Sequence, residues 1–196
     1  MRVVVGAVAV LALVAGCSAQ RAETPAVDPT STPVSTPPTR SSGSAAGPEK
    51  YTTEKLKSCL DIRQQVGADL PPAQPDDDQR LGSTSSVKTC TFKAAEQTII
   101  FNVRSWENTD NAAGIVSGPD SARKYFSDRT ASWEKDSGVA VGSDVRWRDA
   151  QASACALEAL DENAVLTVVR SGSAESEQCR TSVRELAKKF YAAVQP

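Results

Sequence analysis

Four cysteines in the second part of the chain constrain its fold more than any other feature. They are Cys59, Cys90, Cys155 and Cys179. An even number of cysteines in an exported chain is typical of a disulfide framework, and no two of them form the Cys-x-x-Cys spacing that would favour a redox or metal site. Four cysteines allow three pairings. We expect Cys59–Cys90 and Cys155–Cys179, because each bridge would then join neighbouring elements of the chain.

The expectation of export comes from the first 17 residues. Arg2 is followed by an uncharged, apolar run that ends in small residues. A basic start, a short apolar run and a small-residue end are typical of a secretory signal. The run is shorter than the roughly 20 apolar residues that a permanent membrane-spanning helix needs. We therefore predict a signal peptide over residues 1–16.

Val14, Ala15, Gly16 and Cys17 resemble a bacterial lipobox. The resemblance implies that the Cys17 thiol receives a diacylglyceryl group, that the chain is cut before this cysteine, and that the new amino group is often acylated. Two acyl chains hold a protein firmly on a bilayer, whereas one holds it only marginally. The resemblance thus predicts a lipoprotein on the extracytoplasmic face of the cell membrane. The alternative is an ordinary secretory signal with a chance cysteine.

The segment that follows, residues 17–50, contains six prolines, many serines and threonines, and no aromatic residue. Such a composition cannot bury enough apolar surface to offset the loss of chain entropy. We predict a disordered tether that spans about 30 Å as a flexible coil and about 100 Å when extended. Its Thr-Pro pairs are compatible with O-glycosylation or with a bare linker.

Residues 51–196 are expected to form one extracytoplasmic domain, since their length matches a single domain of ~100–150 residues. Apolar residues recur there at helical spacing in three stretches and alternate in five others. This order predicts an α+β domain with two disulfides, in which a mostly antiparallel sheet of about five strands carries about three helices on one face. The expected helices cover about residues 52–66, 119–137 and 176–194, and the expected strands 87–94, 98–106, 145–147, 153–160 and 164–170.

Composition argues against several classes of function. The chain has no histidine, so it lacks the commonest general base and the commonest zinc ligand. Its formal net charge is −2 and its basic residues are scattered, which argues against a nucleic-acid partner. We expect no enzymatic activity, no cofactor and no metal site. The acidic run at residues 76–78 is interpreted as a solvated loop.

Trp106 and Trp147 are the candidate ligand-binding residues. Trp106 falls on the polar face of its expected strand, and Trp147 stands between Arg146 and Arg148. Together with Arg104, these arginines could bind an anionic headgroup or a carboxylate. We expect a site between the sheet and the middle helix. The competing interpretation is that a helix covers this face and that both tryptophans belong to the core.

The order of elements resembles a group of actinobacterial lipoproteins that share a domain of unknown function. The resemblance is carried by the signal and tether, by Cys59 with Gly67, by Cys90 with Phe92, by the turn at residues 141–144 and by Cys179. The Gly142-Ser143-Asp144 turn departs from the Gly-x-Gly-Asp pattern of that family. A looser similarity is to the extracellular two-disulfide sensor domains of mycobacterial serine/threonine kinases.

Neither group implies catalytic residues for this chain. The resemblance implies an envelope protein of unsettled function. We expect a membrane-tethered module that binds or senses a small envelope ligand such as a lipid or glycan. The alternative is an accessory or scaffold subunit that docks on another envelope protein.

Overall fold

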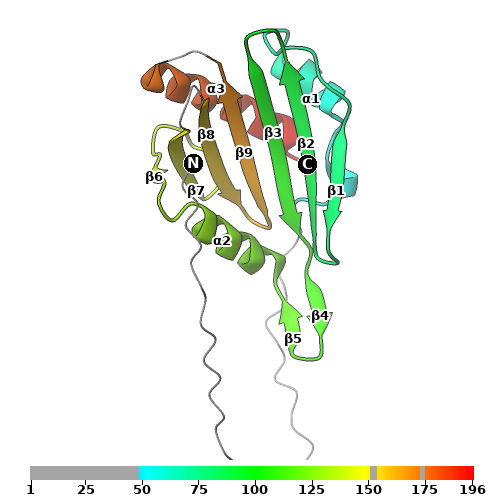
Figure 1. Cartoon of the computed structure of the whole chain (residues 1–196). Coiled ribbons are helices and arrows are strands. Elements are labelled where there is room, and N and C mark those ends of the chain that lie inside the picture. Colours follow the sequence, from blue (N-terminus) through cyan, green and yellow to red (C-terminus); the bar gives the residue numbers. More distant parts are fainter. Residues whose placement is uncertain (1–48, 151–153, 173–174) are drawn as a thin grey trace, which may run out of the picture. The chain divides into compact units, whose positions relative to one another are not determined.

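The computed structural model describes residues 49–150, 154–172 and 175–196, which lie within one compact unit of the chain (Figure 1). The predicted signal peptide, Cys17 and nearly all of the predicted tether lie outside the described residues. The domain is α+β, as the sequence predicts, with three α-helices and a mostly antiparallel sheet.

The main sheet has seven strands in the order β1-β2-β3-β9-β8-β7-β6, and every pairing is antiparallel. The five longer strands are those that the sequence predicts, whereas the two at the edges were not expected. β1 is polar and fully exposed, and β6 has only two residues, so neither shows an apolar alternation. The strands are β1 (Asp77–Leu81), β2 (Ser85–Lys93), β3 (Thr98–Trp106), β6 (Glu134–Lys135), β7 (Asp144–Ala150), β8 (Ala154–Asp161) and β9 (Ala164–Ser171).

A second, two-stranded sheet projects from the domain between β3 and the middle helix. It consists of β4 (Thr109–Asn111) and β5 (Gly114–Val116), in a segment expected to be a loop. Figure 1 shows this hairpin extending beyond the end of the main sheet.

Local side-chain caps set where the helices begin. A short 3₁₀ turn, η1 (Thr53–Lys55), precedes α1 (Cys59–Val66), which therefore starts later than predicted. Ser58 caps α1 by accepting a hydrogen bond from the Asp61 N–H at 3.1 Å. The remaining helices are α2 (Gly118–Arg129) and α3 (Ser176–Val194).

α2 ends about eight residues before the predicted end near residue 137. Thr130 is its C-cap, whose hydroxyl donates to the Phe126 carbonyl at 2.7 Å and whose backbone N–H bonds the same oxygen. Trp133, which continues the helical spacing in the sequence, therefore lies outside the helix.

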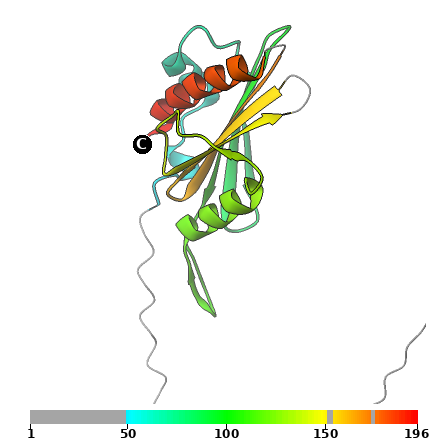
Figure 2. The same ribbon diagram turned by 90° about the vertical axis from the view of Figure 1, so that its left-hand side faces the viewer.

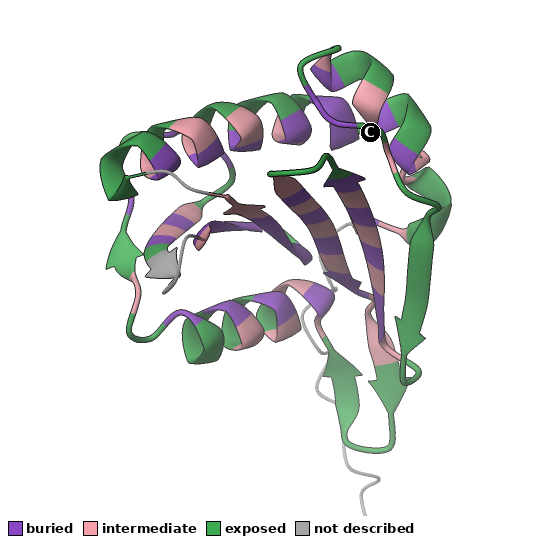
Figure 3. Cartoon of the chain, turned by 45° about the horizontal axis from the view of Figure 1, so that its top comes forward, coloured by how far each residue is buried: buried purple, intermediate pink, exposed green. Residues whose placement is uncertain are grey.

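The helices lie on both faces of the sheet, which corrects the prediction of a single covered face. α1 and α3 cover one face, and α2 crosses the opposite face (Figures 2 and 3). The central strands are apolar on both sides: Leu166 and Val168 of β9 belong to the α3-side core, whereas Val165 of the same strand packs under α2. A sheet with two apolar faces needs a cover on each.

The larger core lies between the sheet and α3. Phe190 of α3 stacks on Phe101 with ring centroids 4.4 Å apart, and on Phe92 at 5.6 Å. The two disulfides confirm the predicted pairing: Cys59–Cys90 ties α1 to β2, and Cys155–Cys179 ties β8 to α3. In the chain-entropy model, loops of this length correspond to about 3–4 kcal/mol each.

Candidate ligand-binding site beside helix α2

The structure divides the five predicted ligand residues between the two faces of the sheet. Arg104, Trp106, Arg146 and Arg148 lie on the α2 face, and Trp147 lies on the α3 face. Residues adjacent in a strand point to opposite faces, so Trp147 is separated from the arginines on either side of it. The prediction of one site near both tryptophans is wrong.

Trp106 is a core residue under α2, with 7 % of its surface exposed. Its ring lies 5.0 Å from that of Tyr125 in α2. The Arg104 guanidinium stacks on both rings, 4.4 Å from the Tyr125 centroid and 5.1 Å from that of Trp106. The helix covers this face, as the competing interpretation held, and Trp106 has little surface left for a ligand.

Trp147 belongs to the core beneath α3 and is 4 % exposed. It pairs with Leu157 across the sheet, and the Arg180 guanidinium lies 5.4 Å from its ring centroid. Arg148, on the opposite face, covers Trp133 at 4.7 Å from the ring centroid. Its side chain thus stacks on a half-buried aromatic ring outside the helix.

Glu158 is a fully buried carboxylate that the sequence analysis did not single out. Its Oε1 accepts hydrogen bonds from Arg129 Nε of α2 and, at 3.3 Å, from the Thr167 hydroxyl. Burial raises the pKa of Glu158, and the hydrogen bond and charge of Arg129 oppose that rise without cancelling it. The sequence signal for a buried carboxylate here is an acidic residue flanked by Leu157 and Ala159 in an otherwise apolar stretch.

Four buried side-chain atoms of the described residues lack a hydrogen-bond partner, and all four lie on the α2 face. They are Arg104 Nε, Asp144 Oδ1, Arg146 Nε and Glu158 Oε2. We refer to these residues as the α2-face polar cluster. An unpaired buried polar group costs roughly 1–3 kcal/mol, and such groups in native proteins are usually satisfied by water or a ligand. No such side-chain atom of the described residues lies on the α3 side of the sheet.

A pocket of ≈ 380 Å³ opens between the C-terminal half of α2 and the start of β7, and two members of the cluster line it. Arg146 Nη2 lies 3.1 Å from the Asp144 Oδ2 atom. Two arginines and one aspartate give the lining a net charge of +1. The lining residues are Arg123, Phe126, Ser127, Thr130, Ala131, Asp144, Arg146 and Leu160.

This lining combines the two kinds of polar group that an anionic, hydroxyl-bearing molecule needs. The Arg146 guanidinium can donate to a carboxylate or phosphate in a fork geometry, and its Nε–H is unused. Asp144 Oδ1 can accept from a ligand hydroxyl. Phe126 and Leu160 supply apolar surface. The pocket lies where the sequence predicts a site, between sheet and middle helix, but only Arg146 of the predicted residues lines it.

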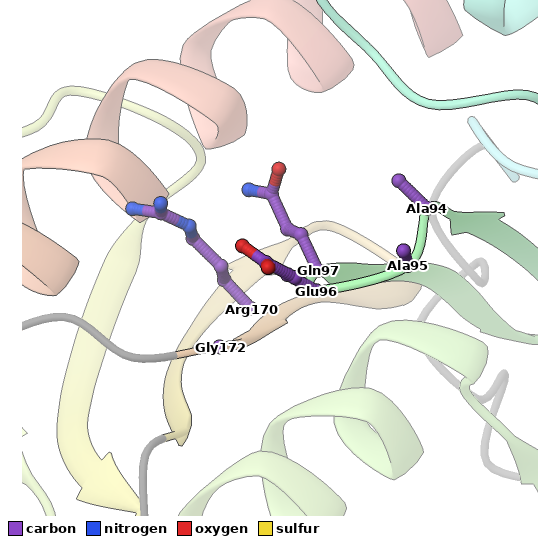
Figure 4. Close-up of a pocket in the computed structure, with 6 residues that line it drawn as sticks. All are labelled: Ala94, Ala95, Glu96, Gln97, Arg170 and Gly172. Atoms are coloured by element: carbon purple, nitrogen blue, oxygen red, sulfur yellow. The ribbon is translucent and has the colours of Figure 1, made fainter.

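A second pocket, of ≈ 440 Å³, lies at the other end of the sheet, by the turn between β2 and β3. Figure 4 shows the side chains of Glu96, Gln97 and Arg170 extending into it, with Ala94 and Ala95 at its edge. One arginine and one glutamate give this lining no net charge. None of the four unpartnered buried atoms belongs to it, so the α2 pocket is the stronger candidate.

The acidic run at residues 76–78 has a structural role. Lys88, almost fully buried, pairs with the Asp76 carboxylate at 3.0 Å and with that of Asp78 at 2.9 Å. Asp76 also accepts the Cys59 backbone N–H at the start of α1. Within the part of the chain that the structure describes, no group of three or more metal-ligating side chains comes together.

Comparisons with known proteins add no family or neighbour. The chain matches no protein-family model, no curated protein and no solved structure. Among residues 49–150, 154–172 and 175–196, no helix has the length and apolar character to cross a bilayer.

Proposed function

We propose that this chain is a membrane-tethered binding module for a small anionic molecule of the cell envelope that also carries hydroxyl groups. A glycerophosphate headgroup and an acidic sugar both have this chemistry. The lipobox-like residues at Cys17 and the proline-rich segment after it support a tether on the extracytoplasmic face. The pocket beside α2 supports the binding role.

The observation that carries the proposal is the pair formed by Arg146 and Asp144. Each has a buried polar atom without a partner, and both side chains line the same pocket. A salt bridge alone would not leave a guanidinium Nε–H and a carboxylate oxygen buried and unused. An anionic ligand with a hydroxyl would match the guanidinium and the carboxylate that line the pocket.

The size of the pocket restricts the ligand. Small-molecule sites commonly measure ~300–1,000 Å³, and this pocket lies near the lower limit. It fits a headgroup or one sugar unit. A lipid ligand would keep its acyl chains outside the pocket.

Isothermal titration calorimetry tests the binding role. The probes are glycerol 3-phosphate, which represents a glycerophosphate headgroup, and glucuronate, which represents an acidic sugar. We expect one of them to bind, and Arg146→Gln to weaken it by about 10- to 100-fold, since hydrogen bonds to charged groups contribute ~1.5–3 kcal/mol. Arg148→Gln is the matched control, because Arg148 lies two residues further along the same strand and stacks on Trp133 outside the pocket. Equal affinity in the wild type and Arg146→Gln would refute this role.

Metabolic labelling with a clickable fatty acid tests the tether. The wild-type chain should incorporate the label, and Cys17→Ala should not. Label in Cys17→Ala at the wild-type level would mean that the segment is an ordinary secretory signal.

A further inference from the structure

The β4–β5 hairpin ends in a run of five exposed residues without a charge: Ala112, Ala113, Gly114, Ile115 and Val116. We call this run the β4–β5 tip. Ile115 is 49 % and Val116 45 % exposed, and they are two of the four large apolar side chains that the described residues expose. The Asn111 side chain accepts the Ala113 N–H at 2.9 Å and fixes the turn.

The predicted tether joins the domain at the base of this hairpin. Glu49, the first described residue, accepts the backbone N–H of Asn108 at 2.6 Å through its side chain. The Asn108 side chain accepts the Gly118 N–H at 2.9 Å and so closes the hairpin base. The chain that leads to Cys17 therefore leaves the domain beside the hairpin that carries the apolar tip.

We propose that the β4–β5 tip contacts the lipid bilayer and orients the tethered domain on it. The inference rests on the membrane tether of the proposed function. Because the tether holds the domain near the bilayer, a weak second contact experiences a high effective concentration and can be occupied. Two aliphatic side chains are too few for binding without a tether, but they suffice for a second contact.

The side chains of the hairpin favour an apolar contact at the membrane–water interface. Asp110, the only charged residue of the two strands, pairs directly with Ile115 and limits the depth to which the tip can enter. With no basic residue in β4, β5 or their turn, the contact should not depend on anionic lipids or on salt.

Quenching by brominated lipids tests the contact in the full lipidated protein, placed in phosphatidylcholine vesicles with brominated or ordinary acyl chains. Ile115→Trp and, separately, Val116→Trp add a fluorophore at the tip. Leu60→Trp is the matched control, because Leu60 is 56 % exposed on α1, and α1 and the hairpin lie at opposite ends of the sheet in Figure 1. The added tryptophan should lose emission in brominated vesicles at the tip positions and not at position 60, in low and high salt alike.

Two results overturn the inference. One is equal emission in both kinds of vesicle for both tip variants, and the other is an equal loss at the tip and at position 60. Flotation of the same samples distinguishes a failure of the tip contact from a failure of the membrane tether. Protein that floats with the vesicles without tip quenching refutes the tip contact alone. Protein that does not float refutes the tether and the tip contact together.

Discussion

The Asn163 side chain binds both backbone polar groups of Tyr51. Its Oδ1 atom accepts the Tyr51 N–H at 2.9 Å, and its Nδ2 atom donates to the Tyr51 carbonyl at 2.8 Å. Nδ2 also donates to the Trp106 carbonyl at 3.0 Å. Asn163 is fully buried, and thus fixes Tyr51 against the end of β3.

Asn163→Ala should therefore destabilise the domain strongly. It leaves three backbone groups unpaired, and each unsatisfied buried group costs roughly 1–3 kcal/mol. We expect a loss of about 3 kcal/mol or more in the free energy of unfolding, measured with urea. Glu162→Gln, one residue earlier and exposed, is the control and should change little. Similar stability in both variants would contradict this role of Asn163.

The Tyr51 contacts also predict how far the chain can be shortened. Tyr51 is 1 % exposed and its hydroxyl donates to Asp161. A chain that begins at Glu49 should melt at the same temperature as one that begins at Cys17, whereas a chain that begins at Glu54 should melt at a markedly lower temperature. Equal melting temperatures for the two shortened chains would show that Tyr51 adds no stability.

Trp147→Ala should cost about 3–5 kcal/mol of stability, as large-to-small changes of buried aromatic residues do. Trp133→Ala is the control, since Trp133 is only half-buried and lies outside α2, so its loss should cost clearly less. Urea unfolding of both variants measures the difference. If Trp147→Ala were as stable as the wild type, its place in the α3-side core would be wrong.

The environment of Asp136 predicts that the folded domain loses stability in acid. Burial alone would raise its pKa, but hydrogen bonds from Arg184, the Gly138 N–H and Arg180 hold the pKa below the usual range of an aspartate. A carboxyl whose pKa is lowered by folding stabilises the fold above its unfolded pKa of ~3.9, and this contribution disappears as the pH falls through the folded pKa.

Asp136→Asn should thus cost about 3 kcal/mol at pH 7, the lower end of the range for breaking a buried ion pair, and less near pH 3, below the unfolded pKa. Glu185→Gln is the control on α3, where the exposed pair with Lys188 should contribute little at either pH. A deficit in Asp136→Asn that is the same at both pH values would show that its charge does not stabilise the fold.

The sequence predicts the fold class and the disulfides because their signals are local. The alternation in β2 and β3 and the apolar face of α3 each lie within one short segment, and each disulfide joins cysteines only 31 or 24 residues apart in the sequence. The side of the sheet on which a helix packs is not determined by a local sequence pattern. α2 lies opposite α3 because Val165 and Leu160 face away from the α3-side core, and that depends on the register of three strands.

The same limit applies to the site. Arg146 was predicted from its charge and its place beside an aromatic residue, and it lines the pocket. Trp106 and Trp147 were predicted from apparent exposure, but burial depends on what covers each face. Glu158 was missed and Asp144 was interpreted as a turn residue, because an unpaired buried oxygen arises only when distant segments meet.

Nuclear magnetic resonance tests the binding role most directly, since it locates a ligand on the folded protein. Glycerol 3-phosphate and glucuronate are added in turn to the ¹⁵N-labelled protein. We predict saturable shifts of the Arg146 Nε–H signal and of the backbone amides of Ser127, Thr130 and Asp144, with one of the two probes. Shifts confined to Glu96, Gln97 and Arg170, or no saturable shift with either probe, would contradict a ligand site beside α2.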